Sequence, residues 1–159
     1  MYDESKVKTL RHIETVRNFI NVVIRDLMDR AEHHDQSKLN EPEVNIFDEY
    51  TAKLRTCEYG SEEYKKFLEE MKPALDHHYA KNRHHPEHYN AISEMNLIDI
   101  VEMLMDWYAA SLRHNTGNIR KSIEINKKRF NMSDELYQIL LNTVDYLDGK
   151  HVYHNAGES

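Results

Sequence analysis

Residues 97–114 read LIDIVEMLMDWYAASLRH, the most apolar stretch of the chain. Its apolar side chains recur at the three- and four-residue intervals of a helix, which predicts a largely buried helix here. Asn96 directly precedes the stretch and is a residue type that caps helix N-termini. Asp106 is the only charged residue between Met103 and Ala110.

Helical periodicity continues on both sides of this stretch. Pro73 is expected to kink the third helix, and Ser133 and Gly149 are suited to begin and end the last one. No alternating strand pattern appears, so the sequence predicts an all-α fold, a single-domain bundle of about six helices. The other helices are expected over roughly residues 3–32, 40–54, 61–85, 119–130 and 134–148.

Composition narrows the classes of protein to which the chain can belong. Its 159 residues predict one domain over residues 1–149, followed by a disordered tail at 150–159. A single cysteine, Cys57, excludes a disulfide framework and a cysteine-rich zinc site. The net charge of −7 disfavours binding to long nucleic acids. No apolar run reaches 18 residues, so we expect a cytoplasmic protein without a membrane span.

Two acidic residues of the central helix are candidates for a functional site. A carboxylate at Asp106, between Met105 and Trp107, is costly to bury unless it is paired or binds a metal. Asp99 lies seven residues earlier on nearly the same face. It is also close to the helix start, where the helix dipole favours an acid. We therefore prefer Asp106 as the functional acid, with Asp99 as the alternative.

Histidines are crowded in two places along the chain. Residues 77–88 read HHYAKNRHHPEH, and residues 33–35 read HHD. His12 lies at the border of the apolar stripe of the first predicted helix. The tandem His34–Asp35 offers a nitrogen and an oxygen ligand to one divalent cation. A histidine-rich surface segment alone is as readily incidental as functional, but the combination with the helical aspartate favours a metal site.

The order of these residues resembles the HD-domain metal-dependent phosphohydrolases, an all-helical superfamily. Its signature is a histidine on an early helix, a His-Asp tandem and a later helical aspartate. These positions match His12, His34–Asp35 and Asp106. The stretch HDQSK also resembles the HDxGK form of the motif, with Ser37 in place of the glycine. The resemblance covers roughly residues 10–115.

The resemblance implies a set of site residues. Asp35 and Asp106 would act in catalysis with Lys38, and Lys38 would join Arg83 and Arg113 in binding the substrate phosphate. The implied metal ligands are His12, His34, Asp35, His78, His85 and Asp106, with His77 and His84 as alternatives to their neighbours.

The expected cofactor is one or two divalent ions. Mixed imidazole and carboxylate ligands favour Mn²⁺, Fe²⁺, Co²⁺ or Ni²⁺, with Mg²⁺ as a weaker occupant. A local positive charge within an acidic protein favours a small phosphorylated substrate such as a nucleotide over a long polymer. The substrate itself stays open, and a homodimer is compatible with the pattern.

Two other functions are compatible with the same residues. A helical protein with this ligand set could hold two irons and activate oxygen, which iron absorption and oxygen uptake would reveal. The chain could also be a non-catalytic nucleotide-binding module with a structural metal. Tight nucleotide binding without turnover would indicate that function.

Overall fold

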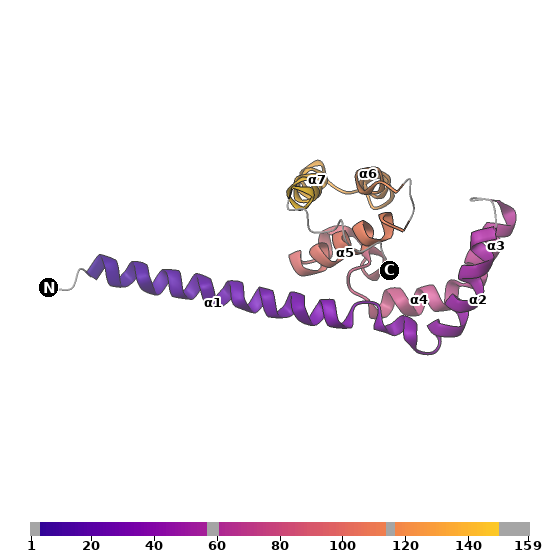
Figure 1. Ribbon diagram of the computed structural model, residues 1–159, viewed down its shortest axis with the longest axis horizontal. Coiled ribbons are helices and arrows are strands. Elements are labelled where there is room, and N and C mark those ends of the chain that lie inside the picture. The colour runs from indigo at the N-terminus through magenta and orange to yellow at the C-terminus, as the bar shows by residue number, and fades with distance from the viewer. Residues whose placement is uncertain (1–3, 57–60, 114–116, 150–159) are drawn as a thin grey trace. The chain divides into compact units, whose positions relative to one another are not determined.

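The computed structural model describes residues 4–56, 61–113 and 117–149. These residues form seven α-helices and three short 3-10 helices, with no strand among them (Figure 1). The all-α class predicted from the sequence is thereby confirmed. The tail at 150–159, which the sequence predicts to be disordered, lies outside the described residues.

The chain divides into two compact units between His78 and Tyr79. The distribution of buried apolar side chains differs between these units. Among the described residues, Met71 and Ala74 are the buried apolar residues of the first unit, and the others belong to the second. The first unit therefore has few buried apolar side chains among its described residues, and its contacts include edge-on ring contacts such as that of Tyr50 with Phe67.

The first unit contains one long helix and several short ones. Helix α1 spans Glu4–His33 without interruption and has no buried residue. The sequence predicted one kinked helix over residues 61–85, but the structure has two helices that are separated at Met71. Pro73 lies in the first turn of the second of these, where its missing N–H costs no hydrogen bond. The remaining elements are η1 (Gln36–Leu39), α2 (Glu43–Thr56), α3 (Glu62–Glu70) and α4 (Lys72–Lys81).

The second unit has a conventional apolar core. Side chains from three helices meet in it, among them the fully buried Met103, Ile123 and Val144. Trp107 stacks on Phe130 with a centroid distance of 6.3 Å. The most apolar stretch of the sequence, which begins at Leu97, therefore forms the central helix of this core. Its elements are η2 (Pro86–His88), η3 (Ile92–Glu94), α5 (Leu97–Ser111), α6 (Ile119–Arg129) and α7 (Asp134–Asp148).

The predicted caps fix where the helices of the second unit begin. The Asn96 side chain accepts hydrogen bonds from the backbone N–H groups of Ile98 and Asp99 at 2.9 and 3.0 Å. The Asp99 carboxylate accepts in return from the backbone N–H of Asn96 at 3.1 Å, which completes a capping box. Ser133 caps α7 by accepting from Leu136. No described helix combines the length and the apolar character that a membrane-spanning segment requires.

Candidate functional site

Asp35 lies at the turn between α1 and η1. Its backbone is in the left-handed region, with φ 57°. Aspartate tolerates this conformation better than most residues do. The turn brings Lys38 back toward it, and the Lys38 Nζ donates to Asp35 Oδ2 at 2.5 Å. His34 Nε2 lies 3.6 Å from the same oxygen. The predicted tandem is thus a local cluster of one carboxylate and two basic groups.

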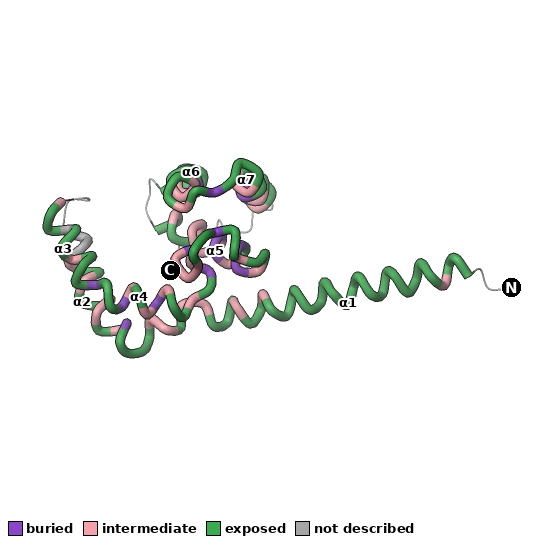
Figure 2. Tube along the Cα trace, turned by 180° about the vertical axis from the view of Figure 1, so that it is seen from behind, coloured by how far each residue is buried: buried purple, intermediate pink, exposed green. Residues whose placement is uncertain are grey.

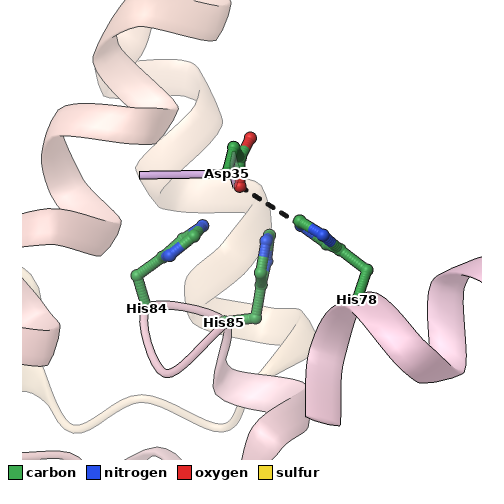
Figure 3. Close-up of side chains that lie close together, drawn as sticks. All are labelled: Asp35, His78, His84 and His85. Carbon is green, nitrogen blue, oxygen red and sulfur yellow. Dashed lines mark ion pairs between the residues drawn. The ribbon is translucent and has the colours of Figure 1, made fainter. Parts of the chain in front are cut away.

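His78 connects this turn to a second carboxylate in the same unit. Its Nε2 lies 3.3 Å from Asp35 Oδ1, the pair drawn with a dashed line in Figure 3. Its Nδ1 donates to Glu43 Oε2 at 2.9 Å. Both His78 and Glu43 are buried. One imidazole is therefore held between two carboxylates, one at each ring nitrogen.

The Glu43 carboxylate has three hydrogen-bond partners. His77 Nδ1 lies 2.7 Å from Oε1, and the Ser37 hydroxyl donates to Oε2 at 3.0 Å. Ser37 occupies the position where the resembling motif has glycine, and a glycine would not make this bond. Ser37 holds the Glu43 carboxylate in place, and this carboxylate in turn orients the His78 imidazole through its Nδ1. Many histidines that bind metals are oriented by a carboxylate in this way.

The surroundings of the two carboxylates lower their pKa values. Burial raises the pKa of the Asp35 carboxyl, but the contact with His78 and the Lys38 ammonium outweigh it and hold that pKa well below its usual range. Burial also raises the pKa of the Glu43 carboxyl. Hydrogen bonds from His77, Ser37 and His78 reverse the effect and lower it. Both groups are therefore ionised at neutral pH.

These pKa shifts predict that the first unit loses stability in acid. The unfolded chain has aspartate and glutamate pKa values of about 3.9 and 4.3, and the folded values for Asp35 and Glu43 are lower. Unfolding then takes up protons, so their contribution is fully present above about pH 5 and falls as the pH drops below about 4. Urea unfolding measured at a series of pH values checks this. The double variant Asp35→Asn, Glu43→Gln should show a shallower acid slope, and an unchanged slope contradicts the prediction.

The histidines that follow α4 form a second cluster within the second unit. His84 is buried, and its Nδ1 lies 3.0 Å from Glu102 Oε1 of α5. Its ring lies 4.1 Å from that of His85, centroid to centroid. Figure 3 shows both rings on the loop after α4. Asp106 lies one helical turn after Glu102 and is half-buried. The second unit thus has its own imidazole–carboxylate pair.

Asp99, the alternative to Asp106, has a structural role. It is fully buried and accepts from Arg83 Nε and Nη2 at 3.2 and 3.0 Å, and from the Tyr89 hydroxyl at 2.8 Å. These contacts add to its part in the capping box. Arg83, predicted to bind a substrate phosphate, is thus engaged with Asp99.

Two other predicted site residues lie away from these clusters. His12 is exposed on α1, which continues without a break to His33. At 1.5 Å per residue, the helix separates His12 from Asp35 by about 30 Å. His12 therefore does not join Asp35 on a metal within one chain, and its place in the predicted ligand set is corrected. Arg113 is exposed in the turn after α5 and has no described contact with a site residue.

Sequence reasoning missed Glu43 and Glu102. Glu43 reads as an ordinary acid in the first turn of a helix, where the dipole favours it. Glu102 could have been found from its position four residues before Asp106, because residues at this spacing share a helix face. No comparable signal marks Glu43, whose partner His78 is 35 residues away.

The comparisons with known proteins place the chain in a family. Residues 1–146 match the model of a family of unknown function, DUF5662. The chain belongs to this family. The match covers both units, so the carboxylate–imidazole pairs of both fall within the DUF5662 region. No curated protein and no solved structure matches the chain.

Proposed function

We propose that this DUF5662 protein is a metal-dependent phosphohydrolase that acts on a small phosphate ester, such as a nucleotide. The observation that carries the proposal is the approach of His78 Nε2 to Asp35 Oδ1. When Nδ1 donates its proton to Glu43, Nε2 presents a lone pair. A bare lone pair would repel the carboxylate oxygen 3.3 Å away, so this approach requires either a metal ion between the two atoms or a proton on Nε2 that is donated to Asp35.

A divalent transition ion fits this pair of donors. Imidazole nitrogen and carboxylate oxygen are ligands that Mn²⁺, Fe²⁺, Co²⁺ and Ni²⁺ accept readily. Asp35 is ionised and His78 is fixed in orientation by Glu43, so both are ready to bind without rearrangement. A second proton on His78 would also relieve the repulsion, and the two explanations differ in whether metal is retained.

The resemblance to the HD-domain phosphohydrolases supplies the rest of the proposed ligand set. It groups His34, Asp106 and His85, or His84 in its place, with Asp35 and His78. His84 already has the arrangement typical of a metal ligand, because Glu102 holds its other ring nitrogen. The proposal leaves out His12, which lies at the far end of α1.

The chemistry of the proposed site follows from its charges. A bound divalent ion would polarise a phosphoryl oxygen and acidify a coordinated water. Lys38 stands against Asp35 and would offer its ammonium to a substrate phosphate oxygen. Asp35 would then hold both the ion and the lysine in place.

Metal content is the test of this proposal. Protein purified without an affinity tag is analysed for metals after incubation with Mn²⁺ or Fe²⁺, next to the variant Asp35→Ala. We expect about one or two equivalents of metal in the wild type, and loss of the metal in the variant because it removes an anionic ligand. Asp48→Ala, an exposed aspartate of α2, is the matched control and should retain metal.

Activity is then measured on the metal-loaded protein with a panel of nucleotides and phosphate esters. Phosphate release by the wild type and its loss in Asp35→Ala would support the hydrolase. Bound metal and nucleotide without turnover would favour the non-catalytic module, and oxygen uptake with iron would favour the oxygenase. Absence of metal from the wild type would overturn the metal site itself.

A further inference from the structure

Helix α1 presents a long apolar stripe that its own unit does not cover. The stripe consists of Ile13, Val16, Ile20, Val23, Ile24 and Leu27, and none of these residues is buried. Leu10 and Phe19 flank the stripe and are 56% and 69% exposed. Figure 2 shows α1 exposed along almost its whole length. Scattered exposed apolar residues are ordinary, but a contiguous stripe marks an interaction surface.

The spacing of the stripe fits a partner helix. Ile13, Val16, Ile20, Val23 and Leu27 follow one another at intervals of three and four residues. This alternation is the heptad pattern by which one helix packs along another. With the flanking Leu10 and Phe19, the stripe places eight apolar side chains along one side of a helix of 30 residues. A partner helix laid along it would cover these side chains together.

The charges of α1 favour an antiparallel second copy of this chain. The half over residues 4–18 has Lys6, Lys8, Arg11 and Arg17 against Glu4 and Glu14. The half over residues 19–33 has Asp26, Asp29 and Glu32 against Arg25 and Arg30. An antiparallel pair sets the basic half of one helix against the acidic half of the other, whereas a parallel pair sets like against like.

We propose that α1 is a homodimerisation helix, in which the stripes of two copies pack antiparallel with Ile20 near the two-fold axis. Ile20 is the midpoint between Ile13 and Leu27, the first and last residues of the heptad pattern. Ile13 of one copy then contacts Leu27 of the other and the reverse, as in an isologous interface, in which both copies use the same surface. This pairing is independent of the metal site.

The test compares the full-length wild type with Ile20→Glu and Asn18→Glu by sedimentation over a range of concentrations. We expect a wild-type dimer whose Kd rises about a hundredfold or more in Ile20→Glu, because the interface loses two buried isoleucines and gains two charges. Asn18 is exposed on the opposite side of α1, so Asn18→Glu should remain dimeric. Circular dichroism confirms that both variants keep their helix content. A monomeric wild type, or equal dimerisation of both variants, would overturn the proposal.

Cross-linking tests the orientation in a Cys57→Ser background, since Cys57 is the only cysteine. Ile20→Cys should form a disulfide-linked dimer under oxidation. Ile13→Cys and Leu27→Cys should cross-link to each other when mixed, and neither to itself. Self-cross-linking of Ile13→Cys at the rate of Ile20→Cys would show a parallel pair and overturn the antiparallel arrangement.

Discussion

If the proposed metal site is correct, the variant Glu43→Gln is expected to bind metal about ten- to a hundredfold more weakly than the wild type, because it removes the charge that orients the proposed ligand His78. Glu43 is fully buried and accepts from His78 at 2.9 Å. The amide keeps the shape of the side chain but lowers the basicity of the imidazole and can turn an NH₂ group toward it. Titration with Mn²⁺ or Co²⁺, followed by calorimetry or by the visible spectrum of Co²⁺, measures the change.

The control for this variant is Glu49→Gln, also on α2. Glu49 is exposed and pairs with Lys53 at 2.5 Å, so its change to glutamine should leave metal affinity unaltered. A urea unfolding curve separates the two effects of Glu43→Gln, because a merely structural role would lower stability and leave the affinity of the folded protein unchanged. Wild-type affinity in Glu43→Gln would show that Glu43 does not position His78 for metal.

The second large effect is a loss of folding stability in the variant Asp99→Ala. We expect Asp99→Ala to lower the free energy of unfolding by about 2 kcal/mol or more. It removes a fully buried carboxylate that accepts hydrogen bonds from the partly exposed Arg83 guanidinium and from the Tyr89 hydroxyl. It also removes half of the capping box at the start of α5. Thermal and urea unfolding measure the change.

An exposed ion pair of the same unit provides the control for this variant. Asp145 pairs with Arg120 on the surface, where its side chain is 64% exposed. Asp145→Ala should cost less than about 1 kcal/mol, because solvent screens such pairs. Equal losses from Asp99→Ala and Asp145→Ala would mean that the Asp99 cluster adds little beyond an ordinary surface pair.

The sequence predicted the helices of this chain well, and the reason is local. Periodicity and caps depend on residues within about four positions of one another, as with Asn96 and Asp99 at the start of α5. The same locality explains why the His34–Asp35 tandem and Lys38 could be found, since one turn brings all three together. The division of the 61–85 helix at Met71 was not predicted, because a proline is compatible with either a kink or a new first turn.

The partners of the candidate ligands could not be predicted from such local signals. The sequence left Asp99 and Asp106 as alternatives, and the contacts of Asp99 with Arg83 and Tyr89 gave it a structural role. His12 matched the motif in order but not in space, because order says nothing about the distance that an unbroken helix imposes.

The sequence by itself determined an all-α chain, the caps of its helices and the His-Asp turn, because each depends on short-range geometry. Only the tertiary structure decided that Glu43 contacts Nδ1 of His78 and that Glu102 contacts Nδ1 of His84. The buried position of Glu43 has the same origin, since burial of a charge is set by the elements that close over it. Contacts between helices distant along the chain thus turn a histidine-rich sequence into two oriented carboxylate–imidazole pairs.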